Sequence, residues 1–97
     1  MGGKYKGRIL WYLNEYKILR YGELSKTLPD ITTKILTQTL RELEKDTLIN
    51  RKVYQQVPPK VEYSLTEVGM ELIPFIQYLK EWRDKQIEKE IANVTNR

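Results

Sequence analysis

The sequence predicts a small α+β domain, mainly helical, in which three helices precede a β-hairpin and a fourth, longer helix follows it. Apolar side chains recur at three- and four-residue spacing along most of the chain. Strict alternation replaces this spacing only between residues 49 and 65. Because the chain has 97 residues and 40% hydrophobic content, it can close one modest core, and we expect a single domain over residues 1–97.

Three helical segments are expected in the first half of the chain. The first spans about residues 4–16, and its apolar stripe consists of Ile9, Leu10, Leu13 and Tyr16. The second is short and ends before Pro29, because the residue that precedes a proline avoids the helical region. The third begins after an N-cap at Thr32 or Thr33, and its stripe consists of Ile35, Leu36, Leu40 and Leu43. The last two predict a helix-turn-helix over about residues 21–46.

The second half of the chain predicts a hairpin and a long helix. The hairpin covers about residues 49–66, and the prolines of the segment VPPK stiffen its tip. Thr66 is a typical N-cap, so the final helix is expected over about residues 67–92. Pro74 lies inside this helix and predicts a kink between Met70 and Pro74.

Composition excludes several classes of function. The sequence has no cysteine and no histidine, so it contains no disulfide, no thiol nucleophile, no typical zinc site and no Ser-His-Asp triad. We expect no enzyme activity, no metal and no cofactor. No apolar run approaches the length of a membrane span, and the N-terminus has no apolar signal segment. We therefore expect a cytoplasmic protein with no membrane partner.

The third predicted helix carries a polar face opposite its apolar stripe. Lys34, Thr37, Gln38 and Arg41 share this face, which has no carboxylate in its N-terminal half. Glutamine can pair with adenine, arginine and lysine can pair with guanine, and threonine offers a hydroxyl and a methyl group. The face therefore suits a DNA major groove. A solvated helix face without a ligand is the alternative that the residues leave open.

The predicted hairpin is basic. Arg51, Lys52 and Lys60 lie on its two strands, beside a tip that contains Pro58 and Pro59. Such a projection can contact a DNA backbone or a minor groove. An edge hairpin whose lysines prevent aggregation would have the same composition.

Four segments of the sequence resemble a known family. These are GKYKGRILWYL, RYGELSKTLPDIT, LTQTLRELEKDTLINRKVY and VPPKVEYSLTEVG. In order and spacing they are similar to the HxlR-type family of bacterial and archaeal winged-helix regulators, which is related to the MarR group. The resemblance covers about residues 3–83.

The resemblance implies a winged helix-turn-helix with a long C-terminal dimerisation helix. It also implies a sequence-specific regulator of double-stranded DNA, most simply a repressor, that acts as a homodimer. The alternative is a winged-helix module that binds protein. By position, the recognition helix would supply Thr32, Thr33, Lys34, Thr37, Gln38 and Arg41. Backbone contacts would come from Arg20 and Tyr21 at the second helix and from Arg51, Lys52 and Lys60 in the wing.

Many members of this family sense oxidants through a cysteine before the first helix, and this sequence has none. Either a short segment precedes residue 1 in the complete protein, or this member responds to another signal.

Aromatic residues on the first and last helices predict a dimer interface, because a long terminal helix on a small domain usually needs a partner. The alternative is that they complete the monomer core. A two-fold dimer would contact half-sites about 34 Å apart on a pseudo-palindromic operator. The seam between these helices is also the expected pocket for a small-molecule effector. The predicted interface residues are Trp11, Tyr12, Phe75, Tyr78, Leu79 and Trp82.

Overall fold

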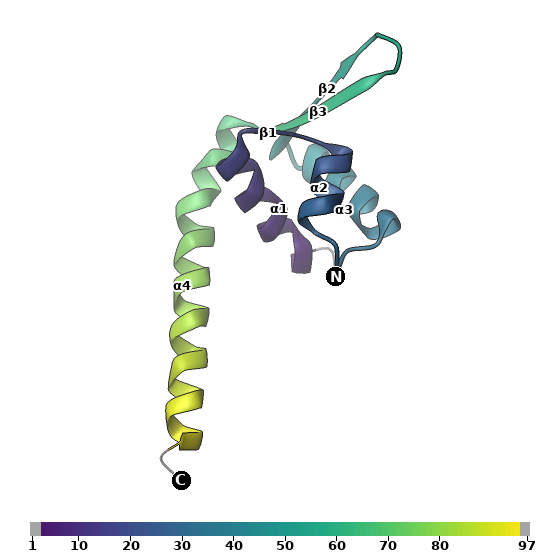
Figure 1. Ribbon diagram of the computed structural model, residues 1–97. Helices are drawn as coiled ribbons and strands as arrows, with labels where there is room; N and C mark the ends of the chain where they lie inside the picture. Colours follow the sequence, from purple (N-terminus) through teal and green to yellow (C-terminus); the bar gives the residue numbers. More distant parts are fainter. Residues whose placement is uncertain (1–2, 96–97) are drawn as a thin grey trace.

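The computed structural model describes residues 3–95 and contains four helices and a three-stranded sheet (Figure 1). The elements in chain order are α1 (Gly3–Tyr16), β1 (Ile18–Arg20), α2 (Tyr21–Thr27), α3 (Thr33–Lys45), β2 (Ile49–Tyr54), β3 (Lys60–Leu65) and α4 (Glu67–Thr95). The predicted α+β, mainly helical fold is confirmed, and the order of elements is that of a winged helix-turn-helix.

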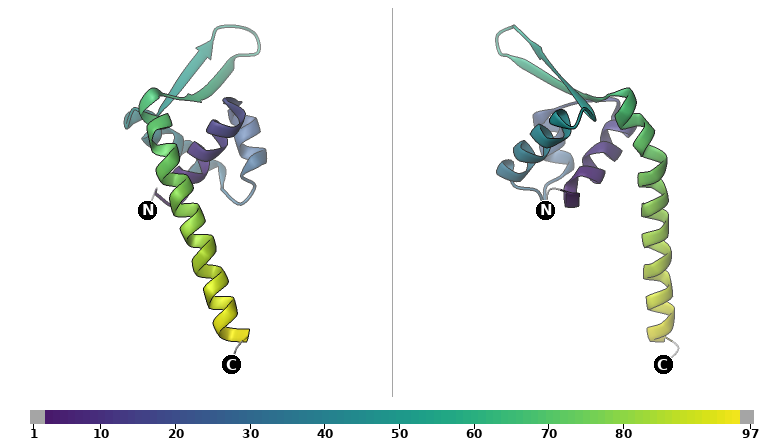
Figure 2. Two further views of the ribbon diagram at one scale, coloured as in Figure 1. Left: turned by 90° about the vertical axis from the view of Figure 1, so that its left-hand side faces the viewer. Right: turned by 180° about the vertical axis from the view of Figure 1, so that it is seen from behind.

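The core lies between α1, α2, α3 and the base of the sheet, with the start of α4 beside α1 (Figure 2). Leucines at helical spacing fill it, among them Leu13, Leu24, Leu36 and Leu43. Two residues of the predicted stripes are not part of it. Tyr16 is 60% exposed and stacks on Tyr12, and Ile35 is 37% exposed. Thr39 is buried in α3, and its hydroxyl donates to the Ile35 carbonyl at 2.7 Å.

A short strand, β1, joins α1 to α2 and was not among the elements predicted from the sequence. Lys17 ends α1 with a positive φ of 67°, and its amide donates to the Leu13 carbonyl. The next three residues pair antiparallel with β3, so the sheet has the order β1-β3-β2. The strand is too short to show an alternating pattern, since Leu19 is its only buried residue. Residues 18–20 form a strand because they are hydrogen-bonded to β3, which is distant in the sequence.

The wing, residues 49–65, consists of β2, β3 and the loop between them. The strands pair from Ile49↔Leu65 to Tyr54↔Lys60. Its buried residues are at the base, where Ile49, Tyr63 and Leu65 join the core. The outer half projects away from the helices (Figure 2), so the wing offers both of its faces to a ligand.

The corner between α3 and β2 holds the start of α4. Thr47 has a positive φ of 62°, and the amide of Leu48 donates to the Leu43 carbonyl, which closes the end of α3. Thr66 is the predicted N-cap of α4, because its hydroxyl accepts from the Gly69 amide at 3.0 Å. A side chain at Gly69 would overlap the Leu48 carbonyl oxygen. This close approach requires glycine and determines where α4 leaves the domain.

Helix α4 continues through Pro74 to Thr95, past the predicted end at about residue 92. No glycine or proline follows Pro74 to stop it, and its last turns contain the helix formers Glu and Lys. Its second half extends beyond the domain (Figure 1). The predicted kink between Met70 and Pro74 stays a prediction. Within residues 3–95, no helix is both long enough and apolar enough to cross a membrane.

Candidate nucleic-acid interface

Helix α3 presents a polar face on the side opposite the core. Thr32 caps the helix, since its hydroxyl accepts from the Ile35 amide at 3.2 Å, and this decides between the two predicted N-caps. The next turns bury Leu36, Leu40 and Leu43. Five side chains line one shallow, open hollow on the opposite side, and we call them the polar face of α3: Thr33, Lys34, Thr37, Gln38 and Arg41. The predicted recognition residues therefore lie together, with Thr32 at the cap.

Two carboxylates near the C-terminus of α3 pair with α1. Lys6 of α1 lies 3.3 Å from Glu42 and 3.6 Å from Asp46, the C-cap of α3. These ion pairs hold both carboxylates on the side of α1. The polar face itself carries two cations, Lys34 and Arg41, and no carboxylate, a composition that suits phosphate.

A bidentate ion pair connects α1 to the turn before α3. Arg8 donates to the two carboxylate oxygens of Asp30 at 2.7 and 3.1 Å. The hydrogen bond to Asp30 also raises the pKa of Arg8. The pair ties the entry of α3 to α1, the helix that contacts α4.

Arg20 and Tyr21 lie at the entry of α2, where their side chains are placed differently. The Arg20 amide donates to Glu23 Oε1 at 2.9 Å and closes the first turn, while its side chain stays exposed. The Tyr21 hydroxyl donates to the Thr33 carbonyl at 3.2 Å and lies 3.1 Å from Thr37 Oγ1. Tyr21 therefore bonds to α3, whereas the guanidinium of Arg20 remains open to a ligand.

The wing contains a cluster that the sequence did not predict. The Tyr54 ring lies between two ammonium groups, with Lys52 Nζ 4.9 Å and Lys60 Nζ 4.8 Å from its centroid. Lys60 also pairs with Glu62 at 3.3 Å. A hydrogen bond from Tyr54, followed by the hydrogen bond and charge of Lys60, holds the pKa of Glu62 below its ordinary value of 4.5.

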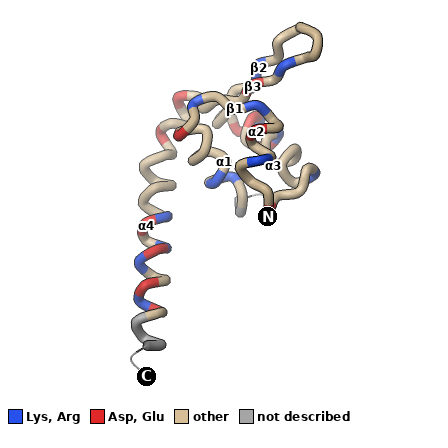
Figure 3. The backbone as a smooth tube through the Cα atoms, viewed as in Figure 1, with Lys and Arg blue, Asp and Glu red and all other residues tan. Residues whose placement is uncertain are grey.

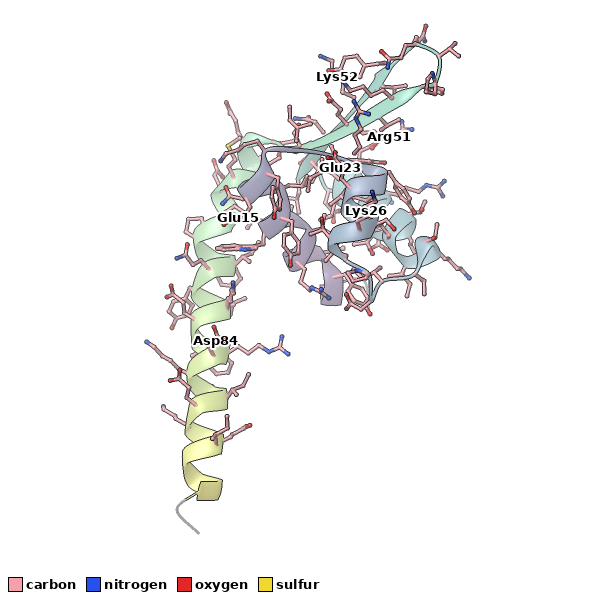
Figure 4. The ribbon with its side chains drawn as sticks, viewed as in Figure 1. Glu15, Glu23, Lys26, Arg51, Lys52 and Asp84 are labelled. Atoms are coloured by element: carbon pink, nitrogen blue, oxygen red, sulfur yellow. The ribbon has the colours of Figure 1, made fainter. Side chains whose placement is uncertain are left out.

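This cluster separates the three predicted wing contacts. The side chain of Lys60 is only 25% exposed and its charge is offset by Glu62, so it offers less to a phosphate than predicted. Arg51 and Lys52 both extend from β2 (Figure 4). Within the described residues Arg51 has no ion pair. The register Tyr54↔Lys60 would have revealed the cluster, but the register depends on the length of the loop.

The charges of the wing and of α4 are arranged differently (Figure 3). The wing is mainly basic, whereas acidic and basic residues alternate along the second half of α4. This mixed pattern is typical of a solvated helix surface and gives no patch for an anionic ligand.

The predicted dimer residues fall into two groups. Trp11 and Tyr12 pack partly against the core and line a groove of about 410 Å³ between α1 and α4. Lys80 lies 4.8 Å over the Trp11 ring in this groove. The other four, which we call the apolar stripe of α4, are between 45% and 63% exposed: Phe75, Tyr78, Leu79 and Trp82. Leu79 also lines the groove. The stripe does not complete the monomer core, so that alternative is wrong for α4.

Protein comparisons identify the family. A family model described as HxlR-like helix-turn-helix matches residues 1–91. The uncharacterized HTH-type transcriptional regulator YdeP of Bacillus subtilis is 53% identical over 85 residues, which cover 88% of this chain and 66% of YdeP. The uncharacterized HTH-type transcriptional regulator YkvN of the same species is 52% identical over 93 residues, which cover 95% of this chain and 77% of YkvN.

Solved structures agree with this assignment. The crystal structure of ytcD has a TM-score of 0.83 and 49% identity, covering 90% of this chain and 88% of that one. The redox regulator HypR in its reduced form has a TM-score of 0.81 and 41% identity, covering 89% and 84%. The family model spans most of the chain. The two solved structures have the same fold as the chain. The chain therefore belongs to the HxlR-like helix-turn-helix family.

Proposed function

We propose that this chain represses transcription as a homodimer that binds a pseudo-palindromic operator in the cytoplasm. Its family and its relatives are transcriptional regulators, and the chain is accordingly a DNA-binding regulator and not an enzyme. One observation carries the proposal furthest, namely the polar face of α3, which is free of carboxylates and lies opposite a fully buried leucine stripe.

The polar face supplies the chemistry for contacts with bases. Gln38 can pair with adenine, and Arg41 and Lys34 can pair with guanine. Thr32 and Thr33 stand at the N-terminus of α3, where the helix dipole favours a phosphate. Arg51 and Lys52 of the wing then contact the backbone beside the same groove, while Arg20 contacts it near α2.

The apolar stripe of α4 supports the homodimer. It combines large exposed aromatic residues on a helix that extends beyond its own domain, and such a surface is costly in water without a partner. A two-fold axis would pair each stripe with its copy. The groove between α1 and α4 is the site proposed for a small-molecule effector. The 97 residues contain no cysteine, so thiol oxidation within them is not part of the proposal.

Selection of bound sequences from a random DNA pool tests the proposed function. We expect a palindrome from the unmodified protein. The double variant Gln38→Ala, Arg41→Ala should lose about 1–3 kcal/mol of discrimination for each good contact with a base. Gln77→Ala with Lys85→Ala is the matched control, because it also removes one amide and one cation, from α4. Unchanged operator preference in the α3 variant would exclude α3 as the recognition helix and favour the protein-binding alternative.

A further inference from the structure

Three polar groups form a hydrogen-bonded bridge between α2 and the polar face of α3. The Tyr21 hydroxyl oxygen lies 3.2 Å from the Thr33 carbonyl oxygen and 3.1 Å from Thr37 Oγ1. Tyr21 and Thr37 are both partly buried, and Thr37 also lines the open hollow of the polar face. The hydroxyl of Thr37 thus has one side toward Tyr21 and the other toward the proposed DNA.

When both bonds are formed at the same time, the number of protons determines their direction. A tyrosine hydroxyl carries one proton, and a backbone carbonyl can only accept. Tyr21 therefore donates to the Thr33 carbonyl, and its oxygen is left to accept from Thr37. The single proton of the Thr37 hydroxyl is used in this bond. Toward the groove, Thr37 can offer only a lone pair and its methyl group.

This direction bears on base selection. A free threonine hydroxyl can donate or accept and so pairs with either kind of base edge. A threonine that only accepts must meet a donor, and the donors in the major groove are the amino groups of adenine N6 and cytosine N4. The oxygens and nitrogens of the guanine edge, and O4 of thymine, would face a second acceptor.

We propose that Tyr21 is a positioning residue that makes Thr37 an acceptor, so that Thr37 selects an adenine or cytosine amino group at one operator position. The inference rests on the proposed DNA-binding function and makes it more specific. Tyr21 acts through Thr37 and α3, and its own hydroxyl does not reach the DNA. It therefore differs in role from the phosphate contact that the sequence predicted for this residue.

The test uses the operator that the unmodified protein selects. Thr37→Val, which removes the hydroxyl but keeps the shape, identifies the base pair whose preference depends on Thr37. Each Watson–Crick pair presents one amino group in the major groove, so the test moves this group from the strand that Thr37 faces to the opposite strand. Replacing adenine by hypoxanthine, or cytosine by uracil, with the opposite base matched, turns the donor on the contacted strand into an acceptor. The unmodified protein should then bind about 3- to 10-fold more weakly, which corresponds to the loss of one hydrogen bond.

Tyr21→Phe is the decisive variant. It removes the acceptor inside the protein, so the Thr37 hydroxyl is free to donate, and the same replacement in the DNA should weaken binding by no more than about 2-fold. Tyr16→Phe is the matched control, because Tyr16 is exposed and contacts Tyr12 through its ring. Tyr16→Phe should bind the replaced DNA about 3- to 10-fold more weakly, like the unmodified protein.

Circular dichroism and thermal melting verify that each variant folds. If Tyr21→Phe does not fold, Tyr21→Met, which also removes the hydroxyl, takes its place and should show the same loss of discrimination against the replaced base. Equal discrimination in the unmodified protein and in Tyr21→Phe would overturn the inference and leave the proposed function intact. Failure to select any sequence would overturn both.

Discussion

The helices α3 and α4 differ in how far their apolar residues are buried. In α3, Leu36, Leu40 and Leu43 are buried within the monomer, and the side that remains exposed is polar. In α4, Ile73 is buried, while Phe75, Tyr78 and Trp82 are each more than half exposed. Helix α3 therefore buries its apolar side within the monomer, whereas α4 leaves most of its apolar side exposed.

This difference teaches what each surface can bind. A polar, carboxylate-free face that costs nothing to leave in water suits an anionic, hydrated ligand such as DNA. An exposed aromatic surface gains free energy when it is covered by a similar surface, about 25 cal/mol for each Å² of apolar area. The two helices divide the two proposed tasks, contact with DNA and dimerisation.

The largest expected effect is a loss of stability when a leucine on the buried side of α3 is truncated. Leu43 is fully buried, so Leu43→Ala should lower the free energy of unfolding by about 2–5 kcal/mol. Denaturant unfolding at two protein concentrations measures it, and the loss should be the same at both. Leu79→Ala is the matched control, since Leu79 is 45% exposed. The loss of unfolding free energy in Leu79→Ala should grow with protein concentration, because this variant weakens the dimer. The same concentration dependence in Leu43→Ala and Leu79→Ala would contradict the difference between α3 and α4.

The next effect concerns the exposed side of α4. Trp82→Ala should weaken the homodimer by about 2 kcal/mol or more, because aromatic residues at the centre of an interface carry much of its binding energy. Light scattering over a dilution series measures the dimer dissociation constant. Gln77→Ala, on a different side of α4, should leave it unchanged. A monomer in the unmodified protein at micromolar concentration would refute the proposed dimer.

The wing allows a finer comparison on the DNA side. Arg51→Ala should weaken binding to all sequences alike and reduce the slope of log affinity against log salt by about 0.9, the value for one phosphate contact. Lys60→Ala should reduce the slope by less, because Glu62 already neutralises Lys60. Binding measured at several salt concentrations separates the two. A larger slope change for Lys60 than for Arg51 would show that its pair with Glu62 opens on DNA.

The smallest effect is the pH response of the wing cluster. The pKa of Glu62 is lowered in the folded protein by Tyr54 and Lys60, so ionised Glu62 stabilises the fold above its unfolded pKa. This contribution is lost as the pH falls through the lowered folded value. In an NMR titration, the midpoint of the Glu62 carboxyl should lie below 4.5 and rise in Tyr54→Phe. Tyr16→Phe should not change it, and a midpoint that stays low in Tyr54→Phe would exclude the hydrogen bond as the main cause.

Much of the fold was predictable because its signals are local. Helical spacing placed α1, α2 and α3, and the N-cap Thr66 placed the start of α4. The exposed position of Ile35 was not predictable, because its spacing fits the stripe and only the packing of α1 and the sheet decides which edge of a helix is covered. Strand β1 escaped prediction since a single buried residue, Leu19, gives no pattern.

The candidate site was predictable to the same extent. The polar face of α3 follows from spacing within one helix, so its members could be named from the sequence. The hydrogen-bond and ion-pair partners of the site's polar groups could not be predicted from the sequence. Lys60 pairs with Glu62 in the same strand and lies over the ring of Tyr54 in the neighbouring strand. The hydroxyl of Tyr21 donates to a carbonyl twelve residues later.

The sequence by itself determined which side of each helix is apolar and which residue types are missing. These properties depend on spacing within one element and on composition, both of which precede folding. The class of function followed from the resemblance of four sequence segments to a known family. Only the tertiary structure decided that β1 joins the sheet, that the apolar stripe of α4 stays exposed, and that Thr37 is bonded to Tyr21. These depend on distances between elements, which exist only once the core has packed.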